Sequence, residues 1–137
     1  MKYWINTISQ DHVIFGKQEG FVQAGHKKEA ALKKLQPDDR LIFYSPQTSL
    51  QNGKSVRAFT AVAKIKDKDV YRVIVNNDFQ LYRRNAEYED CPEVPIKVLI
   101  ERLEFITNKQ HWDLKFRSGL FEINQHDFEL IYGLMRL

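Results

Sequence analysis

Cysteine is almost absent from this chain of 137 residues, because Cys91 is the only one. A single cysteine cannot form a disulfide within the chain, which excludes a disulfide-stabilised secreted domain and fits a reducing cytoplasm. The sequence also lacks a run of about 18 apolar residues, so no membrane span is expected. The first residues read as a strand and lack the apolar stretch of a signal peptide. We therefore expect a cytoplasmic protein that does not enter a membrane.

Glycine and proline are sparse too, with six and four residues. The glycines stand singly, so neither a Walker phosphate loop nor a Gly-x-Gly-x-x-Gly nucleotide motif is present. No two of the four histidines have a spacing that would place both on one helix face; they are His12, His26, His111 and His126. Because zinc sites need three or four converging ligands, we expect no metal, and no cofactor motif is present either.

The residues around Cys91 make it a poor nucleophile. Its neighbours Glu89, Asp90 and Glu93 are acidic, and nearby carboxylates raise the pKa of a thiol. Ser45 stands at the end of a predicted strand, but without the Gly-x-Ser-x-Gly turn that exposes a catalytic serine. The sequence shows no activated nucleophile, so we expect a binding protein and not an enzyme.

The net charge is small, because 21 lysine and arginine residues against 18 acidic residues give +3. Any binding of nucleic acid must therefore come from local basic patches and not from a global field. With 43% hydrophobic and 28% charged residues, the composition is that of a globular protein with a core. The length predicts one domain over residues 1–137.

The most apolar stretch lies between residues 40 and 66. Two segments, Leu41–Pro46 and Arg57–Ile65, are separated by Asn52-Gly53, a dipeptide typical of hairpin turns. Neither segment alternates between apolar and polar residues, so both faces of the two strands are expected to be covered. We interpret this hairpin as the floor of the fold and as one wall of its site.

Further strands are expected over residues 2–7, 21–23, 70–75, 80–88 and 120–123. Helices are expected over residues 9–15, where Gly16 would end the first helix, and over residues 26–35. Another is expected from Pro95 to Leu103, and a final helix after its cap, Asn124. This order of short strands and helices predicts a small α+β barrel.

Aromatic and hydrogen-bonding side chains at predicted strand ends are the remaining candidates for function. A planar base needs ring faces for stacking, worth about 1–3 kcal/mol per base, and donors and acceptors along its edge. The candidates for such a slot are Trp4, Phe21, Gln23, His26, Phe43, Tyr44, Phe59, Thr60, Trp112 and Phe116, with Asn6 and Ser45 at the polar edge. Phosphates would be held by Lys17, Lys27, Lys28, Arg83, Arg84, Lys115 and Arg117.

These assignments have structural alternatives. Phe43, Phe59 and Phe116 are also what an ordinary core requires. The lysine-rich helix face also fits simple solvation. Arg83 and Arg84 are strand neighbours that point to opposite faces, so at most one of them can meet a given groove.

Several segments, in order along the chain, carry a resemblance to a known family: Tyr3-Trp4-Ile5, Gly20 to Gln23 with His26, Pro37 with Asp39 to Pro46, Ala58 to Ala61, and Leu103 to Ile123. With this ordered set the chain resembles the EVE domain family, in particular its small stand-alone bacterial and archaeal members. The resemblance implies a PUA-like mixed β pseudo-barrel of about six strands flanked by three to four helices. The ASCH and YTH domains belong to the same superfamily.

The resemblance also implies a module that binds nucleic acid, DNA or RNA, and holds a modified base at the barrel mouth. YTH domains hold a methylated adenine and EVE domains are implicated in reading modified cytosines, so either base is expected. Carried over by position, the pocket is Trp4, Asn6, Gly20, Gln23, His26, Tyr44, Ser45, Phe59 and Thr60, closed by Trp112, Phe116 and Leu120. The phosphate contacts are Lys27, Lys28, Arg83, Arg84 and Arg117.

Two alternatives remain beside this hypothesis. One is a small ASCH-like amidohydrolase that acts on acylated nucleosides, which would need a lysine or carboxylate with a shifted pKa in the pocket. The other is a barrel that only presents a surface to a protein partner. The base-binding hypothesis requires Trp4, Gln23, Tyr44 and Phe59 to lie together around an opening.

Overall fold

The computed structural model describes residues 1–25, 29–76 and 79–136. The strands in these ranges are β1 (Tyr3–Thr7), β2 (Phe21–Gly25), β3 (Arg40–Gln47), β4 (Ser55–Ile65), β5 (Tyr71–Asn76), β6 (Phe79–Glu89), β7 (Val94–Pro95) and β8 (Leu120–Ile123). The helices are α1 (Gln10–Glu19), α2 (Glu29–Lys33), α3 (Gln125–Met135) and the short 3₁₀ helices η2 (Ile96–Val98) and η3 (Lys115–Ser118). In the described part of the chain, no helix is both long and apolar enough to cross a membrane.

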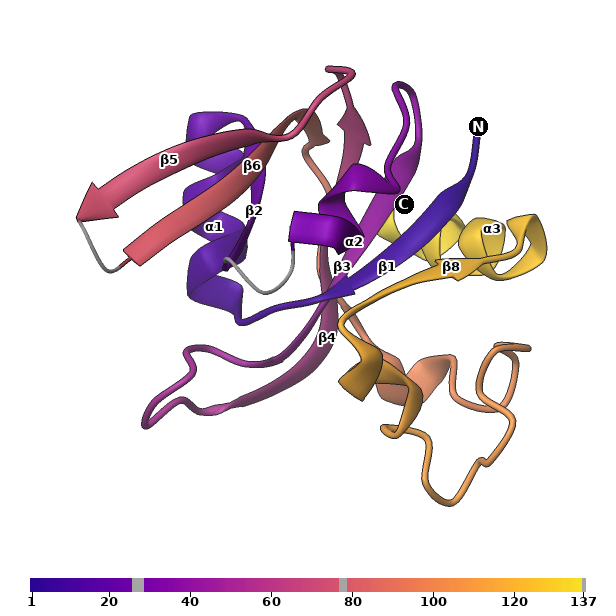
Figure 1. Ribbon diagram of the computed structural model, residues 1–137. Helices are drawn as coiled ribbons and strands as arrows, with labels where there is room; N and C mark the ends of the chain where they lie inside the picture. Colours follow the sequence, from indigo (N-terminus) through magenta and orange to yellow (C-terminus); the bar gives the residue numbers. More distant parts are fainter. Residues whose placement is uncertain (26–28, 77–78, 137) are drawn as a thin grey trace.

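The strands form one curled sheet in the order β2-β6-β4-β3-β1-β8, with β5 paired to β6 and β7 to β4. β1 runs parallel to β3, whereas β3 and β4 are antiparallel neighbours. Figure 1 shows β5 and β6 extending from one end of the sheet, away from β8 and α3. This architecture confirms the predicted mixed α+β pseudo-barrel. The two-residue strand β7 is the one that the sequence did not indicate.

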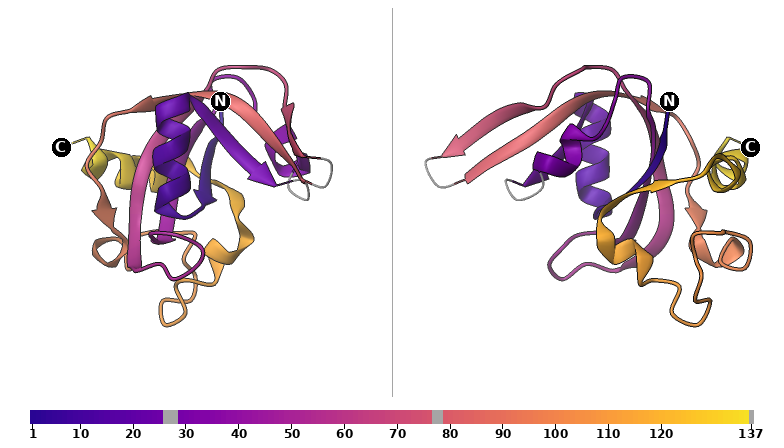
Figure 2. Two further views of the ribbon diagram at one scale, coloured as in Figure 1. Left: turned by 90° about the vertical axis from the view of Figure 1, so that its left-hand side faces the viewer. Right: turned by 45° about the vertical axis from the view of Figure 1, so that its right-hand side comes forward.

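The central strands β3 and β4 are covered on both faces, as their unbroken apolar runs predict. Leu41 and Phe43 of β3 belong to a buried cluster with side chains of α1 and α2. Ile42 and Tyr44, the alternate residues, belong to a second cluster with side chains of α3. In Figure 2 α1 and α3 lie on opposite sides of these strands. Each fully buried aliphatic or aromatic side chain contributes about 1.5–3 kcal/mol, so two cores hold this hairpin in place.

The first helix is longer than predicted. α1 continues through Gly16 and ends at Gly20, whose φ of 80° is the left-handed conformation of a helix C-terminus. Gly16 meets a different requirement, because a Cβ there would lie 2.6 Å from the backbone oxygen of Phe21 and 2.8 Å from Oη of Tyr88. The prediction that Gly16 ends the helix is therefore wrong: it lets the helix pack closely on β2.

The next helix, predicted over residues 26–35, is observed as the shorter α2, Glu29–Lys33. Residues 26–28 lie outside the described part of the chain.

The prediction of an α-helix from Pro95 to Leu103 is wrong as well. Residues Ile96–Val98 form the 3₁₀ helix η2 and turns follow it. Two carbonyl groups of these turns, those of Ile100 and Leu103, instead accept hydrogen bonds from Nζ of Lys109, at 3.0 and 2.9 Å. The apolar spacing still predicted burial correctly, since Leu103 is fully buried.

Candidate functional site

A cleft of about 480 Å³ opens at the end of β1 and β3. Its other walls come from β4 and from the segment of residues 112–117, which lies below the sheet in the view of Figure 1. This volume lies in the range of small-ligand pockets, about 300–1,000 Å³. The lining residues are Thr7, Tyr44, Pro46, Gln47, Ser55, Arg57, Trp112, Asp113, Phe116 and Arg117.

The inner wall of the cleft is built from aromatic rings. Tyr44 and Phe116 stack with ring centroids 4.0 Å apart and an angle of 22° between their planes. Trp112 stands nearly perpendicular to Tyr44, at 80° and 6.4 Å. Tyr44 and Phe116 are buried, whereas Trp112 is only half-buried. Trp112 therefore offers the largest accessible ring surface, supported by two rings that the core fixes in place.

β4 reaches the cleft through an irregularity in its pairing with β3. Ser45 pairs with Ala58 and Gln47 with Ser55, so one residue of β3 lies opposite two of β4, which is a β-bulge. Arg57 is one of these two residues and has a φ of 50°, a left-handed conformation that is uncommon for any residue except glycine. Such strained backbone clusters at functional sites. The bulge brings the exposed Arg57 to the cleft, which it lines.

Two hydroxyl groups at the inner end of the cleft have no hydrogen-bond partner among the described residues. Thr7 and Tyr44 are register partners on the parallel strands β1 and β3, so their side chains lie side by side. Oγ1 of Thr7 is buried without a partner. Tyr44 is only 2% exposed and lines the cleft, yet Oη finds no partner within the described ranges. Buried polar groups are normally paired, so these two hydroxyls leave unused hydrogen-bonding capacity at this end of the cleft.

Tyr44 keeps its proton under all ordinary conditions. Burial raises the pKa of Tyr44 to about 12, against the opposing effect of the Arg57 cation and with a small further rise from Asp113. The hydroxyl is therefore neutral at pH 7 and can donate a hydrogen bond.

The rim of the cleft carries more positive than negative charge. Arg57 forms no ion pair within the part of the chain that the structure describes. Arg117 pairs with Asp113 at 3.5 Å, but the two side chains are 71% and 53% exposed. Exposed pairs of this kind are worth little, so Arg117 can exchange this partner for an anion at small cost.

The cleft contains four of the predicted site residues, Tyr44, Trp112, Phe116 and Arg117. The sequence did not indicate the other six lining residues. Strand ends were the available signal, because Thr7 ends the first predicted strand and Arg57 begins the second strand of the hairpin. The bulge that exposes Arg57 has no sequence signature of its own. The residues missed are Thr7, Pro46, Gln47, Ser55, Arg57 and Asp113.

Other predicted pocket residues lie near the cleft without lining it. Oγ of Ser45 and Oγ1 of Thr60 form a 2.8 Å hydrogen bond with each other and are buried. Phe59 is fully buried and packs edge-on against Tyr44, at 5.7 Å and 67°. These residues support the cleft from behind. Asn6 and Leu120 are paired between β1 and β8.

The structure separates the remaining predicted pocket residues from the cleft. Trp4 lies in the opposite core, where its Nε1 donates to the buried carboxylate of Asp39 at 3.0 Å. Gln23 lies on β2 and accepts a 2.8 Å hydrogen bond from Nε of Arg83. Gly20 ends α1. The requirement that Trp4 and Gln23 join Tyr44 and Phe59 around one opening is therefore not met, because Trp4 lies in the other core and Gln23 lies on β2, which β6 and β4 separate from β3.

Neither predicted strand arginine lines the cleft. Arg84 is fully buried, and its guanidinium donates to Oδ1 of Asp67 at 2.7 Å and to the carbonyl oxygens of Leu32 and Leu35 at 2.8 and 2.6 Å. It is a core residue that has no surface for a phosphate. Arg83 lies over the ring of Phe21, 3.9 Å from the centroid. The other predicted site residues, His26, Lys27 and Lys28, lie outside the described residues.

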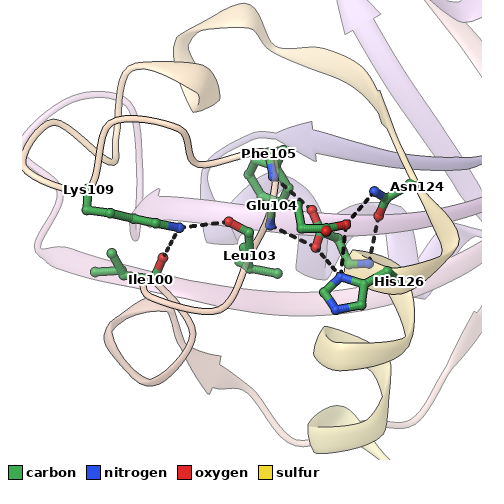
Figure 3. Close-up of polar contacts among 8 residues, drawn as sticks. Ile100, Leu103, Glu104, Phe105, Lys109, Asn124 and His126 are labelled. Atoms are coloured by element: carbon green, nitrogen blue, oxygen red, sulfur yellow. Dashed lines mark hydrogen bonds and ion pairs between the residues drawn. The ribbon is translucent and has the colours of Figure 1, made fainter.

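A separate polar cluster ties α3 to the segment that leads into the cleft wall. Glu104, His126 and Asp127 bring three possible metal ligands within 4.8 Å of one another. However, both oxygens of the buried Asp127 carboxylate already accept backbone N–H groups, from Glu104 and Phe105, each at 2.9 Å (Figure 3). Asn124 caps α3 and donates to Glu104 at 2.9 Å. These bonds account for the cluster as a structural anchor.

Proteins of similar sequence are known in several bacteria. The chain is 45% identical over 135 residues to a UPF0310 protein of Mycolicibacterium vanbaalenii, covering 98% of this chain and 93% of that protein. It is 46% identical over 127 residues to a UPF0310 protein in the gntR 5′ region of Bacillus licheniformis, covering 93% and 86%.

Two solved structures share the fold at low sequence identity. The YTH domain of Zygosaccharomyces rouxii MRB1, solved in complex with N6-methyladenosine RNA, matches with a TM-score of 0.67 and 13% identity, covering 99% of this chain and 87% of that one. The N-terminal domain of Staphylothermus marinus McrB matches with a TM-score of 0.61 and 13% identity, covering 96% and 93%. The EVE domain family model matches residues 2–134, and the chain therefore belongs to the EVE domain family.

Proposed function

We propose that this protein is a nucleic-acid-binding module that holds a modified nucleobase in the cleft between Tyr44, Trp112 and Phe116. The observation that carries the proposal is the pairing of an accessible tryptophan ring with two unpartnered hydroxyls inside a cleft of about 480 Å³. Rings recognise the planar face of a base, and hydroxyls recognise the polar atoms of its edge. The cleft thus has the two kinds of contact that a base requires.

The energetics favour a base as the ligand. Stacking on an aromatic side chain is worth about 1–3 kcal/mol per base, and Trp112 supplies such a surface. Arg57 and Arg117 at the rim supply positive charge for the phosphates that flank a base. The YTH domain with the same fold was solved with an N6-methyladenosine RNA, which makes a methylated adenine one candidate. A modified cytosine is the other.

The proposed site replaces the one predicted from the sequence, which required Trp4 and Gln23 beside Tyr44 and is not formed. It depends on one core face of the sheet. Tyr44, Trp112 and Phe116 form its aromatic wall, and Thr7 and Tyr44 supply its hydroxyls. A methyl group on a base adds apolar surface. Burying that surface against the aromatic wall contributes about 0.8 kcal/mol of binding free energy per methyl-sized group. This gain is the physical basis for a preference for the modified base.

A titration with paired oligonucleotides tests the proposal. Oligonucleotides carrying 5-methylcytosine, 5-hydroxymethylcytosine or N6-methyladenine at one central position are compared with their unmodified counterparts, as single strands and duplexes. We expect at least one modified base to bind several-fold more tightly. Trp112→Ala should weaken that binding by about 1–3 kcal/mol.

The matched control is Tyr71→Ala. Tyr71 is a 37% exposed aromatic on β5, outside the cleft lining, so its removal should leave binding unchanged. The proposal is wrong if no modified oligonucleotide binds better than its counterpart, or if the two variants affect binding equally.

The hydrolase alternative has less support. An amidohydrolase would need a lysine or a carboxylate placed to move protons at the substrate. The described residues that line the cleft include no lysine, and their one carboxylate, Asp113, is exposed and paired with Arg117. We therefore propose binding without catalysis.

A further inference from the structure

A second cavity, of about 260 Å³, adjoins the cleft. The residues of the segment 111–118 divide between the two spaces. Trp112, Asp113, Phe116 and Arg117 line the cleft, whereas His111, Leu114, Lys115 and Ser118 line the second cavity. Trp112 lines both, so one indole ring is a shared wall.

The second cavity combines an apolar surface with positive charge. Leu114 and the half-buried Phe105 supply apolar surface, and Leu114 is 48% exposed although it is a large aliphatic residue. Lys115 and His111 supply nitrogen donors. Among the described residues, those that line this cavity include no carboxylate. Its chemistry suits an anionic ligand with an apolar face.

Lys115 is free to meet such a ligand. Nζ of Lys115 lies 5.1 Å from the centroid of the Phe121 ring, which is a cation–π contact. No carboxylate forms an ion pair with Lys115 in the ranges that the structure describes. A phosphate would therefore add a partner to this amine without displacing one.

The cavity is held in shape by its surroundings. Nζ of Lys109 closes the preceding turns by binding the carbonyl groups of Ile100 and Leu103, and the carboxylate of Asp127 binds the N–H groups of Glu104 and Phe105 (Figure 3). These bonds fix the first part of the loop that carries the cavity, and a 2.9 Å hydrogen bond from the backbone N–H of Thr7 to the carbonyl oxygen of Gly119 fixes its other end. A preformed subsite loses less conformational entropy when a ligand binds.

We propose that this second cavity binds the nucleotide adjacent to the base held in the cleft, with its phosphate at Lys115 and its base against Trp112 and Leu114. The inference rests on the proposed function, because it needs a nucleotide in the cleft. The volume supports a subsite and not a separate pocket, since 260 Å³ is below the usual range of independent ligand sites. The shared ring supports continuity, because a strand whose one base touches Trp112 from the cleft carries its next nucleotide past the same ring.

The test compares mononucleotides with trinucleotides. Two pairs of probes are used. The first pair is 5-methyl-2′-deoxycytidine 5′-monophosphate and the deoxytrinucleotide with 5-methylcytosine between two thymidines. The second pair is N6-methyladenosine 5′-monophosphate and the ribotrinucleotide with N6-methyladenosine between two uridines. We expect the better trinucleotide to bind at least about fivefold more tightly than its mononucleotide, as one added stacking contact allows. Lys115→Gln and Leu114→Ala should each remove much of this gain and leave mononucleotide affinity unchanged.

The matched control is Lys34→Gln. Lys34 is an exposed lysine directly after α2, and α2 packs in the other core from Trp112 and Phe116. Lys115→Gln should reduce the salt dependence of trinucleotide binding by about 0.7 in the log–log slope, and Lys34→Gln should not.

The outcomes separate the two proposals. If neither these probes nor the oligonucleotides with 5-hydroxymethylcytosine bind, the proposed function fails and this inference falls with it. If the mononucleotide binds but the trinucleotide binds no better, or if Lys115→Gln behaves as Lys34→Gln does, only the second subsite is overturned.

Discussion

The replacement Tyr44→Phe isolates the most specific feature of the cleft, the hydroxyl of a buried tyrosine that has no hydrogen-bond partner among the described residues. The substitution keeps the ring that stacks on Phe116 at 4.0 Å and removes only Oη. Because Oη has no hydrogen bond among the described residues, its removal breaks no bond that holds the fold. We expect the free energy of unfolding to change by less than about 0.5 kcal/mol, since an unpaired hydroxyl contributes no net bond.

Tyr88→Phe is the matched control, because its hydroxyl donates to the backbone oxygen of Phe21 at 2.8 Å. Its removal leaves that carbonyl with one partner fewer, at a cost of about 1–2 kcal/mol. This loss corresponds to a fall of about 3–7 °C in Tm for a protein of this size. Urea denaturation followed by fluorescence, together with thermal scans, measures both variants.

The effects of the two variants on binding should be the reverse of their effects on stability. Tyr44→Phe should weaken binding of the preferred modified oligonucleotide by about 1 kcal/mol, or roughly fivefold, since one hydrogen bond to the base edge is lost. Tyr88→Phe should leave the affinity unchanged. If Tyr44→Phe destabilises the protein as much as Tyr88→Phe and leaves binding intact, the hydroxyl has a structural role and the reasoning is refuted.

The same two tyrosines predict an alkaline transition. Burial raises the pKa of Tyr44 to about 12, and it raises the pKa of Tyr88 as well. In the unfolded chain both titrate near pH 10. Their neutral forms are favoured by folding, so this stability is complete below about pH 10 and is lost as the pH rises toward 12. Absorbance of tyrosinate near 295 nm should show delayed titration of both residues, and Tyr44→Phe should reduce the loss of stability above pH 10.

Three further predictions concern the fold. Gly16→Ala should lower the free energy of unfolding by more than about 1 kcal/mol, because the new Cβ would lie 2.6 Å from a backbone oxygen. The control Gly133→Ala in α3 should raise the free energy of unfolding by about 0.5–1 kcal/mol, because the new Cβ would meet no atom within 4 Å. Arg84→Met should cost about 3 kcal/mol or more in urea denaturation, because it removes a buried cation that pairs with the Asp67 carboxylate and donates to two buried carbonyl groups. Asp127→Ala should cost about 2 kcal/mol and reduce oligonucleotide affinity, because it releases two backbone N–H groups of the loop behind the cleft; unchanged affinity would show that this anchor does not support the site.

Sequence patterns determined the class of the fold and the position of its centre. The uninterrupted apolar runs of Leu41–Pro46 and Arg57–Ile65 predicted strands covered on both faces, and both belong to two cores in the structure. Asn124 was expected to cap the last helix and does so. These features are local, because each depends on the spacing of residues within one element. The helix predicted from Pro95 is wrong, because its apolar spacing predicts only burial: the carbonyl groups of Ile100 and Leu103 accept hydrogen bonds from the side chain of Lys109, which follows them in the chain.

Only the tertiary structure decided which aromatic and polar residues meet. Trp4 and Tyr44 both looked like pocket residues, but they point to opposite faces of the sheet, one toward α1 and α2 and the other toward the segment 112–117. A strand places alternate residues on opposite faces, and each bulge shifts that alternation, so a single irregularity decides which core a side chain enters. The bulge at Arg57 also sets the cation at the rim. The chain therefore encodes its strands locally, whereas its cleft exists only where long-range pairing brings three strands and a distant loop to the same place.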